Sequence, residues 1–372
     1  EALRVMAQEI AVLLQLGVPQ AEMGSHFIVV SDGRLDQDGR PVTVLAKKSA
    51  FTTAERNAVE EHTSAHHDLT PLFMPGSEQE PKPGPIEPSA NAFAQLAAIG
   101  PARFAAAYPY DVSTVSDNDP FFFFTFKARQ ALRQVLGGTG AGMDWKNNLG
   151  VVVLGMVLLI SIAAVLLFLI VPLAREQGSQ SIPALPLLYF IAVGLGYIMV
   201  EIALIQRFVL FLGHPTYALT VVVFLMLLAS GSGSLVSRAW LAHTSRLRWL
   251  LAAIAGGALL YVALLPRVLP AWVGMPFLAK LIISGALIVP LAFLMGTPFP
   301  TGLRSLGQRQ TPESASSSSG IEWAWAMNAA SSVLGSVLAI VVAVHFGLNV
   351  TLACAAAAYL LALLFTPALR AA

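Results

Sequence analysis

Long, nearly uncharged runs of apolar residues fill the second part of this chain and restrict it to a membrane architecture. An α-helix needs about 20 mostly apolar residues to cross a hydrocarbon core of about 30 Å. Runs of this kind lie at residues 149–173, 184–211, 216–237, 249–265, 277–297, 322–346 and 349–368. Because lipid offers the backbone no hydrogen-bonding partners, these runs predict an all-α bundle of about seven transmembrane helices.

Charged residues are scarce and unevenly distributed. They make up 12% of the chain, against about 25% of a soluble domain. The only acids beyond Asn147 are Glu176, Glu201, Glu313 and Glu322. The sequence therefore predicts a polar N-terminal part followed by a transmembrane domain over residues 148–372, with the lipid bilayer as its main partner.

The net charge and the cysteine count exclude several classes of function. A net charge of +1 argues against a nucleic-acid partner. The single cysteine, Cys354, allows neither an internal disulfide nor a cysteine metal site. His62, His66 and His67 have a spacing that suits a metal, but no HExxH motif accompanies them and their neighbours are polar. We therefore expect no metal site.

Residues 1–75 have the pattern of part of an α/β domain. Helical spacing of apolar positions in residues 3–16 precedes strand-like residues 26–31 and 42–46, which flank a turn rich in Asp and Gly. Thr52 and Glu55 form a capping-box pattern that begins a second helix, and residues 72–74 would be a short edge strand. This order is typical of the end of a doubly wound, Rossmann-like domain. Since 75 residues give such a sheet only a thin core, we expect its first strands to precede Glu1.

Residues 76–147 are predicted to form a linker and an interfacial segment. Residues 75–90 are rich in Pro, Glu and Gly, and residues 91–108 favour a short helix. The run Phe121–Phe124, followed by Lys127 and Arg129, predicts an interfacial helix with aromatic rings among acyl chains and cations at headgroups. Packing of the run against the polar domain is the alternative. The sequence GGTGAG at 137–142 lacks the flanking residues of a phosphate loop and favours a flexible joint.

Glu201 is the leading candidate for a functional residue, because it lies deep within the second span. A charge at the bilayer centre costs roughly 2.5–3.5 kcal/mol on insertion scales, so such a residue is a functional candidate by default. Tyr197 lies one turn earlier and is expected to hydrogen-bond the carboxyl. Arg207 is about 240° further around the helix and is expected to snorkel toward the helix end instead. Lys280 would pair with Glu201 if the second and fifth spans touch.

Two interpretations of Glu201 stay open. The residue binds a ligand, a small cation or a proton, or it is a buried carboxyl that fixes helix packing. The remaining polar candidates are His214, beyond the second span, and Glu322 and Asn328 in the sixth. An acid in the first turn of a helix suits the helix dipole without any ligand, which is the stronger interpretation of Glu322.

Two patterns indicate how the spans pack. The sequence MGTPFPTGL at 295–303 interrupts the fifth span with two prolines and two glycines, and predicts a helix end or kink. Small residues cluster at 230–234 and 331–336, which favours close helix–helix packing. The sidedness of the membrane domain stays open. The loops between spans are more basic on the side opposite the polar domain, which would place that domain outside the cytoplasm.

The chain resembles the C-terminal part of the bacterial spermidine-synthase-like integral membrane proteins, also described as fused transporter-like/spermidine synthase proteins. The resemblance covers nearly the whole chain. It is carried by GLGYIMVEIALIQRFVLFLGHPTYAL (194–219), MGTPFPTGL (295–303), WAWAMNAASSVLGSVLA (323–339) and, in the first part, HFIVVSDGR, VTVLAKKSAFTTAE and YDVSTVSDNDPFFFF. Asp119 stands where the family usually has Arg, which puts any shared role of that charge in doubt.

The resemblance implies a location in the bacterial inner membrane and a methyltransferase-type Rossmann domain. The residues that bind an S-adenosylmethionine-type nucleotide would precede Glu1, so no cofactor and no aminopropyl transfer are expected from this chain alone. Three hypotheses follow: a membrane-anchored relative of aminopropyl or methyl transferases, a transporter or receptor whose Glu201 contacts a small cation or polyamine, and a non-catalytic subunit that binds protein partners in a membrane complex. The first is favoured as family identity.

Overall fold

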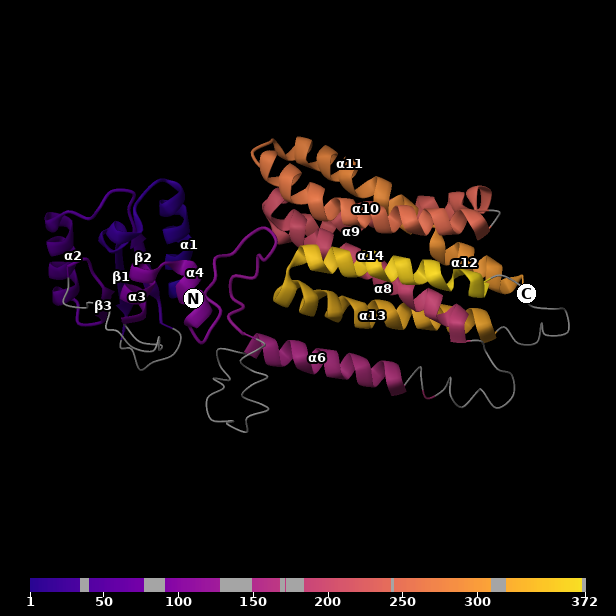
Figure 1. Cartoon of the computed structure of the whole chain (residues 1–372), viewed down its shortest axis with the longest axis horizontal. Helices are drawn as coiled ribbons and strands as arrows, with labels where there is room; N and C mark the ends of the chain where they lie inside the picture. The colour runs from indigo at the N-terminus through magenta and orange to yellow at the C-terminus, as the bar shows by residue number, and fades with distance from the viewer. Residues whose placement is uncertain are drawn as a thin grey trace. The chain divides into compact units, whose positions relative to one another are not determined.

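The computed structural model describes residues 1–33, 40–76, 91–127, 149–167, 171, 184–241, 244–308 and 319–369. The chain divides into two compact units (Figure 1). The first unit is Glu1–Ser116 with Phe121–Leu149, and the second is Asp117–Pro120 with Gly150–Ala372. The short segment Asp117–Pro120 therefore belongs to the membrane part, although it is far from that part in the sequence. The predicted turn at 34–39, most of the linker, the GGTGAG segment and the loop 309–318 lie outside the described residues.

The first unit contains a three-stranded sheet with the order β2-β1-β3. The strands are β1 (Phe27–Asp32), β2 (Val42–Ala46) and β3 (Leu69–Phe73). The first two lie within one residue of their predicted ranges, whereas β3 begins three residues before the predicted 72–74. Both pairings are antiparallel, with Val29 opposite Val44 on one side and opposite Phe73 on the other. The described strands include no parallel pair. A small antiparallel sheet is thus established, and the Rossmann-like assignment stays a prediction.

Helices cover the sheet of the first unit. Helix α1 (Ala2–Gln15) buries Met6, Ile10 and Leu13, which follow the helical spacing of its sequence. Helix α2 (Thr53–Ala65) begins at the predicted capping box, and both of its reciprocal bonds are present. A 3-10 helix, η1 (Gln20–His26), leads into β1. The single helix expected over 91–108 is two helices, α3 (Asn91–Ile99) and α4 (Pro101–Ala107), because Gly100 adopts φ +82° between them.

The predicted interfacial helix at Phe121–Phe124 is wrong for the described residues up to 127, which form turns and extended chain there. The cause is Arg4 of α1, which is 1% exposed. Its guanidinium donates to the carbonyl oxygens of Ser113 (2.8 Å), Phe121 (3.0 Å), Phe122 (2.7 Å) and Phe124 (2.7 Å), and lies 3.6 Å from Asp111.

Lys127 is also held by backbone oxygens of the first unit. Its Nζ donates to the carbonyls of Ala105 (2.5 Å) and Tyr108 (2.8 Å), and burial lowers the pKa of the amine. A helix at Phe121–Phe124 would use its carbonyl oxygens internally and leave the Arg4 donors without acceptors. The segment therefore stays extended against its own unit, which was the alternative interpretation of the sequence.

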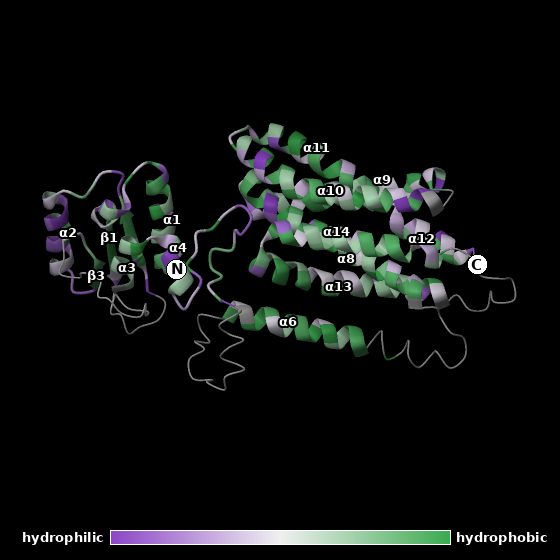
Figure 2. Ribbon diagram, in the orientation of Figure 1, coloured by the Kyte–Doolittle hydropathy of each residue, from purple (hydrophilic) through white to green (hydrophobic). Residues whose placement is uncertain are grey.

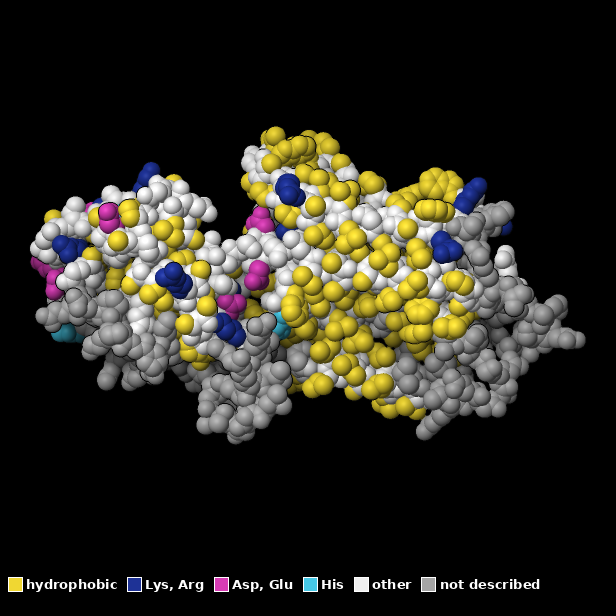
Figure 3. Space-filling model, viewed as in Figure 1, with side chains coloured by type: hydrophobic (Ala, Val, Ile, Leu, Met, Phe, Trp, Pro, Cys, Tyr) yellow, Lys and Arg dark blue, Asp and Glu magenta, His cyan; other side chains and the backbone are white. Residues whose placement is uncertain are grey.

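The second unit is a bundle of long apolar helices (Figure 2). They are α6 (Leu149–Val165), α8 (Ala184–Leu212), α9 (Pro215–Trp240), α10 (Thr244–Ala271), α11 (Phe277–Met295), α12 (Pro298–Gly307), α13 (Ser319–Phe346) and α14 (Leu348–Phe365), followed by the 3-10 helix η4 (Thr366–Leu369). Six described segments, with α11 and α12 counted as one, are long and apolar enough to cross a membrane. The first of the seven predicted spans appears among them only as a shorter apolar helix, Val152–Val165. Hydrophobic side chains cover much of the visible bundle surface (Figure 3), and the chain is that of an integral membrane protein.

Helix α8 is the most buried of the spans and packs against α9, α13 and α14. Small residues make these contacts close, as the sequence predicts. A Cβ atom at Gly194 would lie 2.6 Å from Nδ2 of Asn328, and one at Gly335 would lie 2.6 Å from the side chain of Ile198. Gly233 and Gly296 sit directly against the backbone carbonyls of Phe293 and Ser230. Helix backbones therefore approach one another where these residues lie.

The capping box of α2 makes a first testable prediction. A hydrogen bond from Lys47 (2.6 Å), assisted by the N–H and hydroxyl of Thr52, lowers the pKa of Glu55 to about 2 from 4.5. The stabilisation is therefore complete above pH 4.5 and is lost as the pH falls toward 2. In Glu55→Gln, hydrogen exchange in the first turn of α2 should be faster than in the wild type at pH 6, and the difference should shrink at pH 3. The exposed Glu60 provides the control Glu60→Gln, and equal differences at the two pH values would contradict the prediction.

The hydrogen bonds of the buried Arg4 are expected to stabilise the first unit. Arg4→Met keeps an apolar side chain of comparable length but leaves buried carbonyl oxygens without donors, so the first unit should lose about 3 kcal/mol of unfolding free energy. Pulse proteolysis of the full chain in urea measures this loss. Arg103→Met, at an exposed position of α4, should change the value by less than about 0.5 kcal/mol. Equal stabilities of the two variants would show that Arg4 does not hold the segment.

Candidate functional site

The candidate site lies where α8 faces α9. The hydroxyl of Tyr197 is 3.2 Å from Oγ of Ser230 on α9, so this face of α8 points toward α9. Glu201, one turn further along α8, is half-buried, and its carboxylate interacts electrostatically with Tyr197. The predicted Tyr197–Glu201 hydrogen bond is not formed, because the hydroxyl is directed to Ser230. Among the described residues, no hydrogen bond or ion pair to the carboxylate is found.

Lys280 is not the partner of Glu201. It lies near the start of α11, and its Nζ is 5.7 Å from the ring centroid of Phe211, ten residues beyond Glu201 on α8. No ion pair between the two charges is found in the described part of the bundle. Helix α11 packs mainly on α9. Lys280 of α11 therefore contacts Phe211 near the C-terminal end of α8. The predicted Glu201–Lys280 pair is wrong.

The interruption of the fifth span lies beside this polar region. Helix α11 ends at Met295 and α12 begins at Pro298, as the sequence MGTPFPTGL predicts. The hydroxyl of Tyr189 on α8 donates to the carbonyl of Pro298 at 2.9 Å. Gly296 of the break packs on the backbone of Ser230. Irregular backbone at membrane depth is tolerated where protein covers it or where it borders a cavity, and here α8 and α9 cover it.

Tyr359 of α14 adds a polar group that sequence reasoning missed. The residue is fully buried, and its hydroxyl has no hydrogen-bond partner among the described residues. It lies within electrostatic range of Tyr197 and Tyr189. Gly196 of α8 permits this approach, because a Cβ there would be 2.8 Å from the ring. The sequence carries no signal for Tyr359, which is one aromatic residue in an alanine-rich apolar run.

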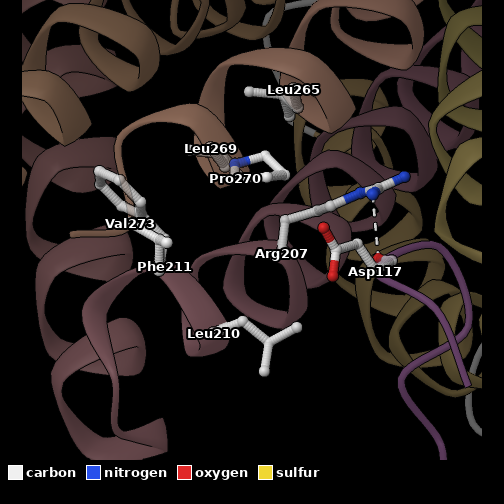
Figure 4. Close-up of a pocket in the computed structure, with 8 residues that line it drawn as sticks. All are labelled: Asp117, Arg207, Leu210, Phe211, Leu265, Leu269, Pro270 and Val273. Atoms are coloured by element: carbon white, nitrogen blue, oxygen red, sulfur yellow. Dashed lines mark hydrogen bonds between the residues drawn. The ribbon is translucent and has the colours of Figure 1, made fainter. Parts of the chain in front are cut away.

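Arg207 does not snorkel. It is 4% exposed, and its guanidinium donates to the carbonyl of Asp117 at 2.9 Å (Figure 4). It also donates to Oδ1 of Asn118 (3.1 Å) and to Oδ1 of Asn349. Oδ1 of Asn118 also accepts from the backbone N–H of Asn349 at 2.8 Å. Arg207 therefore fastens the Asp117–Pro120 segment to α8 and α14. The snorkelling prediction failed because these partners come from distant parts of the sequence.

The other sequence candidates do not reach Glu201. Nδ1 of His214 accepts from the N–H of Thr216 and caps α9. Glu322 lies in the first turn of α13, where the dipole argument placed it. Asn328 donates to the carbonyl of Phe190 at 3.0 Å and ties α13 to α8. The candidate site thus comprises Glu201, Tyr197, Ser230 and Tyr359, beside the break between α11 and α12.

The structure and the comparisons assign no cofactor to this site. Within the described ranges, no group of three His, Cys, Asp or Glu side chains is placed to hold a metal ion. No protein-family model, no curated protein and no solved structure matches the chain.

Tyr359 and Tyr189 form a matched pair for a third prediction. A buried hydroxyl without a partner is unfavourable, whereas the hydroxyl of Tyr189 is bonded. Tyr359→Phe should therefore raise the unfolding free energy of the empty protein by about 1 kcal/mol, and Tyr189→Phe should lower it by about 1 kcal/mol. Unfolding midpoints in a detergent titration measure both changes. A destabilised Tyr359→Phe variant would show that the hydroxyl has a partner.

Proposed function

We propose that the second unit binds and moves a small cation through the Glu201 site. The observation that carries this proposal is a half-buried carboxylate that has no hydrogen-bond or ion-pair partner in the described residues and lies one helical turn from Tyr197. Tyr197 in turn lies within electrostatic range of the unpartnered hydroxyl of Tyr359. Intramembrane acids that are not paired with a protein cation mark ion and substrate pathways. A cation would neutralise Glu201, and the hydroxyl oxygens of Tyr197 and Tyr359 would offer it further ligands.

The broken fifth span supports a transport role. Interrupted membrane helices place backbone carbonyls and helix ends near the binding sites of secondary transporters. Here the break between α11 and α12 contacts both Tyr189 and Ser230. A movement of α12 relative to α11 would therefore change the contacts of Tyr189 on α8 and of Ser230, the hydrogen-bond partner of Tyr197. The unpaired carboxylate of a cation site and an interrupted helix that can act as a hinge therefore occur in the same part of the bundle.

Uptake into proteoliposomes tests the proposal and is the fourth prediction. Radiolabelled methylammonium and sodium are the two probes, each applied with an inward gradient to the reconstituted full chain. Uptake of at least one probe should fall at least about tenfold, equal to about 1.4 kcal/mol, in Glu201→Gln. Tyr359→Phe should also reduce this uptake, since it removes a ligand oxygen.

Glu322→Gln is the control for the uptake assay. It neutralises an exposed acid at the end of α13, away from the site, and should transport like the wild type. Glu201→Gln has to elute as a single folded species before its uptake is compared. Wild-type uptake of neither probe, or unchanged uptake in a folded Glu201→Gln, contradicts the proposal. A Glu201→Gln variant that cannot fold would favour the packing role of the carboxyl.

A second candidate function rests on the resemblance to the spermidine-synthase-like membrane proteins. The order α1, β1, β2, α2, β3 in the first unit agrees with the order expected for the end of a synthase-like domain. Under this proposal the protein is a membrane-anchored relative of aminopropyl or methyl transferases in the bacterial inner membrane.

A further inference from the structure

A cavity separate from the Glu201 site lies at the end of α8. It has a volume of about 270 Å³. Its walls come from the last turns of α8 and α10, from the turn after α10 and from the Asp117–Pro120 segment, all within the second unit. The lining residues are Asp117, Arg207, Leu210, Phe211, Leu265, Leu269, Pro270 and Val273 (Figure 4). Apart from Asp117 and Arg207, the lining is apolar.

Asp117 supplies a carboxylate to this cavity. Its backbone carbonyl accepts the Arg207 hydrogen bond, whereas its carboxylate is turned toward Leu210 and the aliphatic stem of Arg207 (Figure 4). The residue is exposed, and within the described ranges its carboxylate makes no hydrogen bond or ion pair. The carboxylate is therefore available to a ligand.

Arg207 lies within electrostatic range of this carboxylate but does not hydrogen-bond it. Its two terminal nitrogens already donate to the oxygens of Asp117, Asn118 and Asn349. Rotation of the guanidinium toward the carboxylate would break the bonds that hold the Asp117–Pro120 segment. The cavity thus meets the stem of the arginine, while the two terminal nitrogens of its head are directed to oxygens of the protein and its buried Nε has no hydrogen-bond partner in the described residues.

The helix ends make the cavity more negative. Helix α8 ends at Leu212 and α10 ends at Ala271, and Leu210, Phe211, Leu269 and Pro270 of the lining lie in these last turns. The C-terminus of a helix carries a partial negative charge from its aligned peptide dipoles. Two such ends add to the field of Asp117. A cation is favoured here, and an anion would meet repulsion from the carboxylate.

We propose that this cavity binds a primary ammonium group carried on a short alkyl stem. The ammonium would pair with Asp117, and the stem would lie along Leu210, Phe211 and Leu269. The volume is just below the roughly 300–1,000 Å³ of pockets for drug-sized ligands, so it suits a headgroup or a small amine. Arg207 is six residues beyond Glu201, roughly 9 Å along the helix, so this site is distinct from the Glu201 site. The ammonium comes from a phosphatidylethanolamine headgroup or from a free alkylamine.

Calorimetric titration of the full chain in detergent tests this inference and is the fifth prediction. The probe is n-butylammonium, with butyrate and butanol as matched ligands of similar size. Butylammonium should bind saturably and more tightly than either. Asp117→Asn keeps the backbone carbonyl that Arg207 needs but removes the charge, so it should weaken binding at least tenfold. Val273→Trp, at a 47% exposed wall position, should block the cavity, and Glu322→Gln should bind like the wild type.

Several results would overturn the inference. They are the absence of saturable butylammonium binding, equal binding by folded Asp117→Asn, and tighter binding of butyrate, which would assign the cavity to Arg207. If Asp117→Asn does not fold, Val273→Trp alone decides, and its unchanged affinity would refute the site. Nanodiscs distinguish the two sources. Competition by phosphatidylethanolamine but not phosphatidylcholine supports the site and identifies a lipid headgroup, whereas undiminished binding in both lipids supports the site and identifies a free amine.

Discussion

A polar group inside a bilayer has to find its partner within the protein, because lipid offers none. The second unit is organised by this constraint, and α8 is where it is met. Asn328 reaches the carbonyl of Phe190, Tyr189 reaches that of Pro298, and Arg207 reaches Asn118 and Asn349. Each bond joins α8 to another element. Glu201 and the Tyr359 hydroxyl have no such hydrogen bond in the described residues, and both belong to the proposed cation site.

Close helix contact makes these polar bonds possible. Side chains such as Asn328 are short, so the backbones have to approach before the amide can reach a carbonyl on the next helix. Gly194 permits that approach to α13, and Gly196 permits the ring of Tyr359 to lie against α8. The same glycines that pack the bundle thus bring Tyr359 near Tyr197. Packing and the candidate site depend on one set of small residues, which is why larger side chains at those positions would disturb both.

The two proposed sites differ in depth and in surroundings. Glu201 lies within the span beside a helix break, where a bound cation would be shielded from water. Asp117 lies at the end of α8, near helix C-termini and exposed apolar side chains. A small cation suits the first environment, and an amine with an apolar stem suits the second. Arg207 lies between the two sites along α8, and its hydrogen bonds hold the Asp117–Pro120 segment in place.

The sequence by itself determined the features that depend on neighbouring residues. Apolar runs predicted the long spans, MGTPFPTGL predicted the break after Met295, and Thr52 with Glu55 predicted the start of α2. Only the tertiary structure decided the partners of the charges. The Phe121–Phe124 segment is extended because its carbonyls accept hydrogen bonds from Arg4, and Arg207 binds Asp117 and Asn118. Lys280 lies over the ring of Phe211, and Tyr359 lies within electrostatic range of Tyr197. The physical reason is that helix periodicity and capping act over a few residues, whereas a buried charge is satisfied by whichever oxygen or ring the fold brings to it.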